Sequence, residues 1–182
     1  MIDHAYRAIF IHQRKVAGTS IITALGRAPH ESEWHHFNNG TLSSDWAQRD
    51  KSYFVFTAIR NPFDRLISSW KYLSSTRNRA LLAVLQNPPL EGADHRHLTR
   101  PQIAILRDAS SGHLVVDDLI RFESLQEDFD RICDRIGRPK QILPHLNASD
   151  RSRGYRDYYD DETRGLAEAM FGEDLEVFGY TF

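Results

Sequence analysis

The sequence contains little cysteine and no long apolar run, and each of these shortages excludes a class of protein. Cys133 is the only cysteine among 182 residues, so the chain can form neither an internal disulfide nor a thiolate metal cluster. Because Cys133 falls at an apolar position of a predicted helix, we expect a buried core thiol rather than a nucleophile. No apolar run approaches the roughly 18 residues that a membrane-spanning helix needs, and residues 1–7 do not resemble the start of a signal peptide. The sequence therefore predicts a cytoplasmic protein without a membrane span.

A large excess of charge of either sign is also absent. The 23 basic and 25 acidic residues give a formal net charge of −2, which provides no general attraction to nucleic acids or anionic membranes. A polyanionic ligand would therefore have to be bound at a local site. With 41% hydrophobic residues, 182 residues are enough for one domain with a sizeable core and too few for two, so we expect a single domain over residues 1–182.

The stretch with the most chemical information follows a short apolar segment near the N-terminus. Residues 7–12 are predicted to form a buried strand, and Lys15, Gly18, Thr19 and Ser20 come next, at the start of an apolar helix. Backbone N–H groups at a helix N-terminus attract anions, Lys15 adds a full positive charge, and Gly18 permits close approach of the backbone. The pattern predicts a phosphate-binding loop. The alternative is an ordinary strand-to-helix turn in which Thr19 is the N-cap and Lys15 points into solvent.

A second strand-to-helix junction lies further along the chain. Residues 53–59 are rich in aromatic and β-branched side chains, as is typical of a central parallel strand. Arg60 follows, then Asn61 as a good N-cap and Pro62 at the favoured first helical position. The guanidinium fork of Arg60 suits phosphate, and Ser68 lies about 9 Å along the helix axis, so both can reach one anion. In the alternative interpretation, Arg60 is a cap or salt-bridge residue and Ser68 carries a solvated hydroxyl.

Strands and helices alternate along the rest of the chain. The other predicted elements are strands at 34–37 and 114–122, helices at 41–50, 81–85, 125–136 and 160–171, and a polar surface loop at 91–100. This alternation predicts an α/β fold, a three-layer sandwich with a central, mostly parallel sheet flanked by helices. In such a sheet both strand-to-helix junctions lie at the carboxyl ends of their strands, where ligands bind.

The order of residues in the first loop differs from that of a nucleoside triphosphatase. The Walker A pattern G-x-x-x-x-G-K-[ST] is absent, because Lys15 precedes Gly18 by three residues, and this disfavours an ATPase or GTPase. Instead, the order Lys15-Val16-Ala17-Gly18-Thr19-Ser20, joined to Arg60-Asn61-Pro62-Phe63-Asp64-Arg65 and Ser68, resembles the sulfotransferases that use 3′-phosphoadenosine 5′-phosphosulfate (PAPS). The similarity is closest to the carbohydrate-type branch, whose first loop usually reads P-K-x-A-G-T-[ST]. Here Gln13-Arg14 takes the place before the lysine.

Further segments extend the resemblance to nearly the whole chain. They are Arg121-Phe122-Glu123-Ser124-Leu125, Leu143-Pro144-His145-Leu146-Asn147, and the end from Tyr158-Tyr159 to Phe178-Gly179-Tyr180. The resemblance implies a P-loop NTPase-like fold, with PAPS as donor and 3′-phosphoadenosine 5′-phosphate (PAP) as product. It also implies that the first loop holds the 5′-phosphosulfate group and that Arg60 and Ser68 hold the 3′-phosphate.

Arg151 and Arg153 resemble the basic segment that closes over the 3′-phosphate in this family, and the alternative for them is an exposed charged loop. Arg14, next to the first loop, is a candidate to contact the sulfate, or it lies exposed. The candidate donor-binding residues are therefore Arg14, Lys15, Ala17, Gly18, Thr19, Ser20, Arg60, Ser68, Arg151 and Arg153.

Sulfuryl transfer needs a group that stabilises the leaving oxygen and a base that accepts the proton of the acceptor hydroxyl. Negative charge grows on the oxygen that bridges sulfur and the 5′-phosphate, and Lys15 is the candidate to stabilise it. His35 and His36 are candidate bases because histidine titrates near neutrality. Adjacent residues on a strand point to opposite faces, so at most one of them faces the site, and the resemblance favours His36. Glu123 is a further candidate base, with helix capping as its alternative role. The scheme requires no metal ion.

Two other classes of function stay open at this point. A P-loop kinase-like phosphotransferase would need the Gly-Lys-Ser order and a metal-binding aspartate after a strand, and neither is evident. A non-catalytic module that binds PAPS or PAP would keep the donor site without turnover. For a sulfotransferase, the expected partner is a carbohydrate or another small polar acceptor. The chain is short for this family, which leaves room for a homo-oligomer in which a partner subunit completes the acceptor side.

Overall fold

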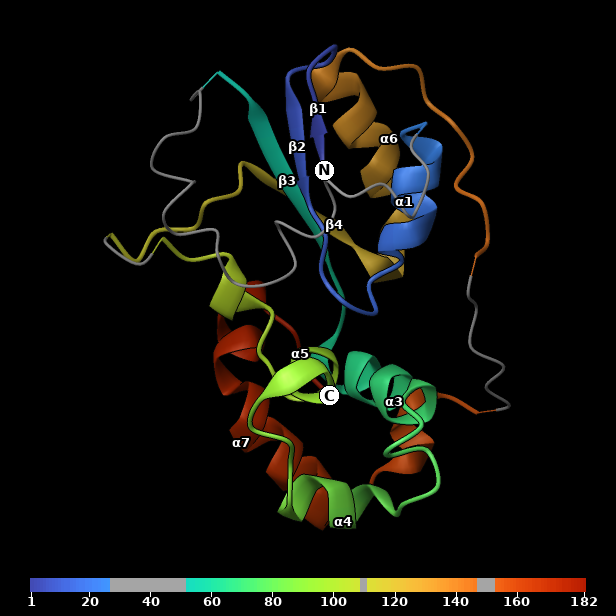
Figure 1. Ribbon diagram of the computed structural model, residues 1–182, viewed down its shortest axis with the longest axis vertical. Coiled ribbons are helices and arrows are strands. Elements are labelled where there is room, and N and C mark those ends of the chain that lie inside the picture. Colours follow the sequence, from blue (N-terminus) through green and yellow to red (C-terminus); the bar gives the residue numbers. More distant parts are fainter. Residues whose placement is uncertain (27–51, 109–110, 147–152) are drawn as a thin grey trace. The chain divides into compact units, whose positions relative to one another are not determined.

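The computed structural model describes residues 1–26, 52–108, 111–146 and 153–182. The chain divides into two compact units (Figure 1). The first consists of Met1–Ile59 and Ile105–Asn147, and the second of Arg60–Ala104 and Ala148–Phe182. That residues 1–182 form a single domain stays a prediction. None of the helices in the described ranges is both long and apolar enough to cross a membrane.

The first unit is built on a four-stranded, mostly parallel sheet with the strand order β1-β2-β3-β4. The strands are β1 (Ile2–Asp3), β2 (Ala8–Ile11), β3 (Phe54–Ile59) and β4 (Asp118–Arg121). β1 pairs antiparallel with β2, whereas β2, β3 and β4 are parallel, with Ile11 opposite Thr57 and Ile59 opposite Arg121. The chain therefore leaves β2, β3 and β4 at one edge of the sheet, the edge at which α/β proteins bind ligands.

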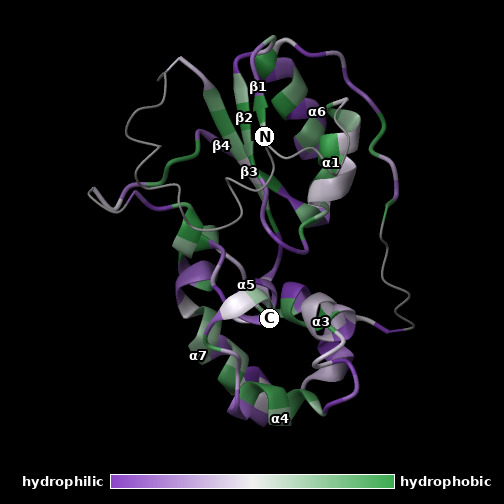
Figure 2. Cartoon of the chain, viewed as in Figure 1, coloured by the Kyte–Doolittle hydropathy of each residue, from purple (hydrophilic) through white to green (hydrophobic). Residues whose placement is uncertain are grey.

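Helices α1 (Gly18–Ala24) and α6 (Leu125–Ile136) pack into one core with the sheet of this unit. Phe10, Phe56 and Ile120 from the strands meet apolar side chains of both helices in that core. Figure 2 shows α6 as alternating hydrophobic and hydrophilic along its length, as expected for a helix with one buried face. Cys133 lies in this core, and burial raises the pKa of its thiol, so the prediction of a buried core cysteine is confirmed. The helix-flanked, mostly parallel sheet confirms the predicted α/β class.

The second unit is helical. Its helices are α3 (Pro62–Tyr72), α4 (Leu81–Gln86), α5 (Gly92–Leu98) and α7 (Asp161–Phe178), and short 3-10 turns in the chain are η2 (Ile103–Ile105), η3 (Phe122–Ser124) and η4 (Tyr155–Tyr158). The core of this unit contains Phe63 and Leu66 of α3, Leu85 of α4, Leu98 of α5 and Phe171 of α7.

Local signals at the start of α3 act as predicted. The Asn61 side chain accepts a hydrogen bond from the backbone N–H of Phe63 at 3.0 Å, and Pro62 occupies the first helical position. The carboxyl end of α6 is likewise closed by Gly137, which has a left-handed backbone with φ 70°. Each of these capping signals involves residues a few positions apart, so the sequence alone predicts them.

One predicted loop is wrong, since residues 92–98 of the segment 91–100 form helix α5. The reason lies in α3, which supplies hydrogen bonds to carbonyl groups at the carboxyl end of α5. The Arg65 Nη2 donates to the carbonyl of Arg100 at 2.7 Å, and the Ser69 hydroxyl donates to the carbonyl of His97 at 2.6 Å. Helix ends leave such carbonyls without intrahelical partners, so these contacts stabilise a short helix that its own sequence does not favour.

Other predicted boundaries also change. The last helix, predicted for residues 160–171, continues to Phe178 past a non-helical residue at Phe171. The strand predicted for 114–122 contains only residues 118–121, and β1 was not predicted at all. The strand predicted for 34–37 and the helix predicted for 41–50 lie outside the described residues.

Candidate functional site

The loop between β2 and α1 has an unusual backbone. Lys15 and Ala17 adopt left-handed conformations, with φ values of 64° and 62°, which are uncommon for residues other than glycine. Such residues cost about 1 to 3 kcal/mol each and persist only where their surroundings hold them. Val16, between them, is fully buried in the core of the first unit and anchors the loop. Loops with left-handed residues can turn successive backbone N–H groups inward, and such concavities bind anions.

The start of α1 rules out one interpretation of this loop. The N-cap is Ala17 and not Thr19, and no side chain caps the first turn. No acidic residue lies in that turn either, so no carboxylate there would repel an anion. Thr19 is half-buried and Ser20 is buried, whereas Arg14 and Lys15 are both half-buried. The alternative with Thr19 as N-cap and Lys15 fully in solvent is therefore wrong.

Gly18 is required by a contact that the sequence pattern does not show. A Cβ atom placed on Gly18 would lie 1.8 Å from Cδ2 and 2.1 Å from Nε2 of His12, the residue that follows β2. Any larger residue at position 18 would force the imidazole to move. His12 thus sits against the loop that contains Lys15, and neither a motif nor a spacing singles it out.

Arg60, at the junction of β3 and α3, is buried, with a side chain 4% exposed. Its Nε and Nη2 contact the Asp64 carboxylate at 2.8 and 2.7 Å. This is the salt bridge of the alternative interpretation, and the phosphate hypothesis for Arg60 stays a prediction. The Gln102 side-chain amide also holds the backbone of Arg60. The Arg60 N–H donates to Gln102 Oε1 and Gln102 Nε2 donates to the Arg60 carbonyl, each at 2.9 Å.

Ser68 lies in α3, whereas Arg60 precedes that helix and its Asn61 N-cap, whose backbone is not helical. The Arg60 guanidinium reaches Asp64 in the first turn, and Ser68 lies one turn beyond Asp64. Ser68 is 4% exposed, which rules out the alternative of a solvated hydroxyl. That Arg60 and Ser68 contact a common anion stays a prediction.

Glu123 lies in η3, directly after β4, and is exposed. It therefore follows the same sheet edge as the loop that contains Lys15. The turn around Glu123 is organised by Asp128, which accepts from the Arg121 N–H at 2.7 Å and from the Ser124 hydroxyl at 2.9 Å. Burial acts to raise the pKa of Asp128, but hydrogen bonds from Arg121, Arg131 and Ser124 outweigh it and lower that pKa.

Of the four remaining candidate residues, the structure describes Arg153. Arg153 is exposed in the second unit, with its guanidinium 5.8 Å from the centre of the Tyr158 ring. Arg151, His35 and His36 lie outside the described residues. Glu123 is thus the one candidate base for which the structure gives a position. Among the described residues, no group of three histidine, cysteine, aspartate or glutamate side chains could hold a metal ion.

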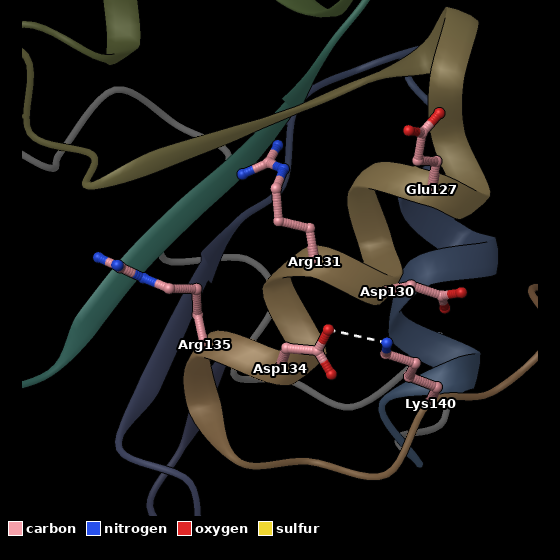
Figure 3. Close-up of a pocket in the computed structure, with 6 residues that line it drawn as sticks. All are labelled: Glu127, Asp130, Arg131, Asp134, Arg135 and Lys140. Carbon is pink, nitrogen blue, oxygen red and sulfur yellow. Dashed lines mark ion pairs between the residues drawn. The ribbon is translucent and has the colours of Figure 1, made fainter.

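The structure also contains a surface depression away from these residues. It lies beside α6, has a volume of about 470 Å³ and is lined by Glu127, Asp130, Arg131, Asp134, Arg135 and Lys140 (Figure 3). An ion pair of 2.8 Å joins Lys140 to Asp134. Basic and acidic side chains are mixed on this face, which is typical of a solvated helix surface, and none of the candidate residues lines it.

Sequence reasoning missed three buried groups near Arg60. Gln102, Asp174 and Arg65 are each at most 2% exposed; Gln102 directly precedes η2, Asp174 lies in α7 and Arg65 in α3. Burial lowers the pKa of the Arg65 guanidinium to about 10, although the charge of Asp174 acts to raise it. None of the three has a spacing that would have marked it, because their partners lie tens of residues away in sequence.

A comparison with known families completes this description. The sequence profile of the sulfotransferase family matches residues 1–181 and so includes both strand-to-helix junctions. No curated protein and no solved structure matches the chain. A match over nearly the full length, together with an α/β sheet of the expected class, identifies the family. The chain belongs to the sulfotransferase family.

Proposed function

We propose that the chain transfers a sulfuryl group from PAPS to a hydroxyl of a carbohydrate or another small polar acceptor. Membership of the sulfotransferase family makes sulfuryl transfer the general reaction class. The choice of PAPS as donor rests on the loop between β2 and α1, in which left-handed Lys15 and Ala17 flank the buried Val16. Left-handed residues of this kind occur in loops that bind anions, and the residue order resembles the PAPS-binding loop.

On the 5′ side of the donor, the residues from Lys15 to Ser20 hold the phosphosulfate. Arg14 adds a second positive charge next to Lys15. The uncapped first turn of α1 offers backbone N–H groups, and Thr19 and Ser20 offer hydroxyl donors. Gly18, which has no side chain, lets the backbone approach the ligand, and the His12 ring occupies the space that a Cβ atom on Gly18 would need.

On the 3′ side, Arg60 and Ser68 bind the phosphate. Asp64 holds the guanidinium of Arg60 through Nε and Nη2, which fixes the orientation of the guanidinium plane. A pre-oriented arginine loses little side-chain entropy when an anion binds. Arg151 and Arg153 add positive charge to this side of the donor.

PAPS supplies a sulfuryl group on a good leaving group, so the chain has two tasks during transfer. As the acceptor oxygen bonds to sulfur, the bond from sulfur to the phosphate oxygen breaks and that oxygen receives the electron pair. Lys15 stabilises the resulting negative charge. A base takes the proton of the acceptor hydroxyl, and the candidates are His36, His35 and Glu123.

The donor assignment is tested by binding of PAP, adenosine 5′-phosphate, ATP and GTP to the purified chain. We expect PAP to raise the melting temperature most, since a ligand at 100 times its Kd stabilises a protein by about 2.7 kcal/mol. The Arg60→Ala variant should lose affinity for PAP far more than for adenosine 5′-phosphate. The exposed Arg164→Ala variant, which breaks an equivalent i,i+4 pair with Glu168, is the control and should bind PAP normally.

Stronger stabilisation by ATP or GTP than by PAP would instead favour a phosphotransferase. Equal losses for PAP and adenosine 5′-phosphate in Arg60→Ala would reject the 3′-phosphate site. Transfer of labelled sulfate from PAPS to a library of carbohydrate acceptors tests turnover. Tight PAP binding with no transfer to any acceptor would indicate a non-catalytic binding module.

A further inference from the structure

The side-chain amide of Gln102 forms a two-point clasp on the backbone of Arg60. The Arg60 N–H donates to Gln102 Oε1 at 2.9 Å, and Gln102 Nε2 donates to the Arg60 carbonyl at 2.9 Å. A partner strand forms the same pair of hydrogen bonds in an antiparallel ladder. Gln102 therefore holds the residue after β3 in the way that a neighbouring strand would, and it is only 1% exposed.

Gln102 is itself held in place by α7. Asp174, which is fully buried, accepts hydrogen bonds from the backbone N–H of Gln102 at 2.7 Å and of Ile103 at 2.8 Å. A longer contact of 3.4 Å joins Asp174 Oδ2 to Nε2 of Gln102. Hydrogen bonds to a buried carboxylate are among the stronger ones in proteins, so the backbone that carries Gln102 has one well-defined position.

The segment before Gln102 is fixed from the other side by α3. The buried Arg65 donates from Nη2 to the carbonyl of Arg100 at 2.7 Å, and Ser69 donates to the carbonyl of His97 at 2.6 Å. The segment 97–103 is thus pinned between α3 and α7. All of these residues belong to the second unit, as Arg60 does.

We propose that Gln102, fixed by Asp174, is a positioning residue that sets the orientation of Arg60 for the 3′-phosphate of the donor. This inference rests on the proposed function, in which Arg60 binds that phosphate. The direction of the Cα–Cβ bond follows from the positions of the backbone atoms of the residue, and Gln102 restrains both the N–H and the carbonyl of Arg60. Displacement of a binding group by about 1 Å can remove much of its contribution to affinity. A buried clasp of this kind therefore controls affinity without touching the ligand.

A purely structural role makes a different prediction. The clasp also satisfies two buried backbone groups, and this alone would stabilise the second unit. In that case the loss of Gln102 would lower the melting temperature and weaken PAP and adenosine 5′-phosphate equally. A positioning role instead affects the ligand that carries a 3′-phosphate.

The test compares Gln102→Met with the wild-type chain by calorimetric titration of PAP and of adenosine 5′-phosphate. Methionine has a similar length and removes both hydrogen bonds. We expect the Kd of PAP to rise roughly tenfold and that of adenosine 5′-phosphate to change by less than about twofold. Gln86→Met is the matched control, because Gln86 lies in the same unit, is exposed and bonds only weakly to Glu162 at 3.3 Å. If Gln102→Met does not fold, Gln102→Asn, which keeps the amide on a shorter side chain, replaces it.

A double-mutant cycle with Arg60→Ala decides whether Gln102 acts through Arg60. Without the arginine, Gln102→Met should cause no further loss of PAP affinity, because the group it positions is gone. Independent, additive losses would overturn the inference, as would an unchanged preference for PAP in Gln102→Met. If the wild-type chain itself shows no preference for PAP, the proposed function fails and the positioning role fails with it. If Arg60→Ala removes that preference and Gln102→Met does not, only the positioning role is wrong.

Discussion

The His12 imidazole occupies the space that a side chain on Gly18 would need, since a Cβ at Gly18 would lie 1.8 Å from His12 Cδ2. His12 follows β2 and Gly18 begins α1, so this contact sets how closely the loop between them can fold. In that loop Lys15 has a left-handed backbone. Packing against His12 therefore requires a glycine at position 18, in addition to any need to leave room for a ligand.

The Gly18→Ala variant should be less stable by about 1 to 3 kcal/mol, because overpacking forces the His12 ring out of place. Urea unfolding measures this loss, and the affinity for PAP should fall in the same variant. The double variant His12→Ala with Gly18→Ala should recover part of the stability, since the clash is then removed. A Gly18→Ala protein with unchanged stability would show that the ring moves at no cost.

The Lys15→Ala variant should lose transfer activity while it still binds PAP with moderately reduced affinity. Removal of one group that stabilises a developing charge lowers kcat by about 100-fold to 1,000-fold. Single-turnover rates at saturating PAPS measure this effect separately from donor binding. Lys140→Ala removes an exposed lysine that follows α6 and should leave the rate unchanged. Unchanged turnover in Lys15→Ala would reject the assigned role.

Variants of the candidate bases should separate rate from donor affinity. If His36 is the base, His36→Gln should bind PAP normally and lose about 100-fold to 10,000-fold in rate. The rate of the wild-type chain should then fall at acidic pH as the imidazole is protonated, and that acidic limb should be absent in the variant. Full activity in His36→Gln would point to His35 or Glu123, and the same measurement on His35→Gln and Glu123→Gln distinguishes those two.

The stability of the first unit should depend on pH through Asp128. Hydrogen bonds lower the pKa of this carboxyl in the folded state, so its contribution is present above the unfolded pKa of about 4 and is lost as the pH falls through the folded pKa. Asp128→Asn should therefore reduce the free energy of unfolding at pH 7 by about 1 to 2 kcal/mol. The difference from wild type should shrink on acidification below about pH 4, as measured by urea unfolding at several pH values. A difference that stays constant between pH 7 and pH 3 would contradict this account.

Much of the fold follows from local patterns. The apolar run of β3, the Asn61-Pro62 start of α3 and the apolar period of α6 each involve neighbours within a few residues, so the sequence predicts them. The candidate anion-binding loop is local in the same sense, because Lys15, Gly18, Thr19 and Ser20 form a short motif. Asp64 and Ser68, four residues apart in the predicted helix, likewise lie on one helix face before any tertiary contact is known.

The sequence by itself determined the segments of β2, β3 and β4, the start of α3, both ends of α6, and which loop residues are suited to bind an anion. Only the tertiary structure decided that residues 92–98 form a helix, that Gln102 holds the backbone of Arg60, and that Asp174 holds Gln102. The physical reason is sequence separation. A helix period or a cap repeats within a turn, whereas the Gln102 amide meets Arg60 across 42 residues and Asp174 meets Gln102 across 72. Contacts of that range have no period and form only once the chain has folded.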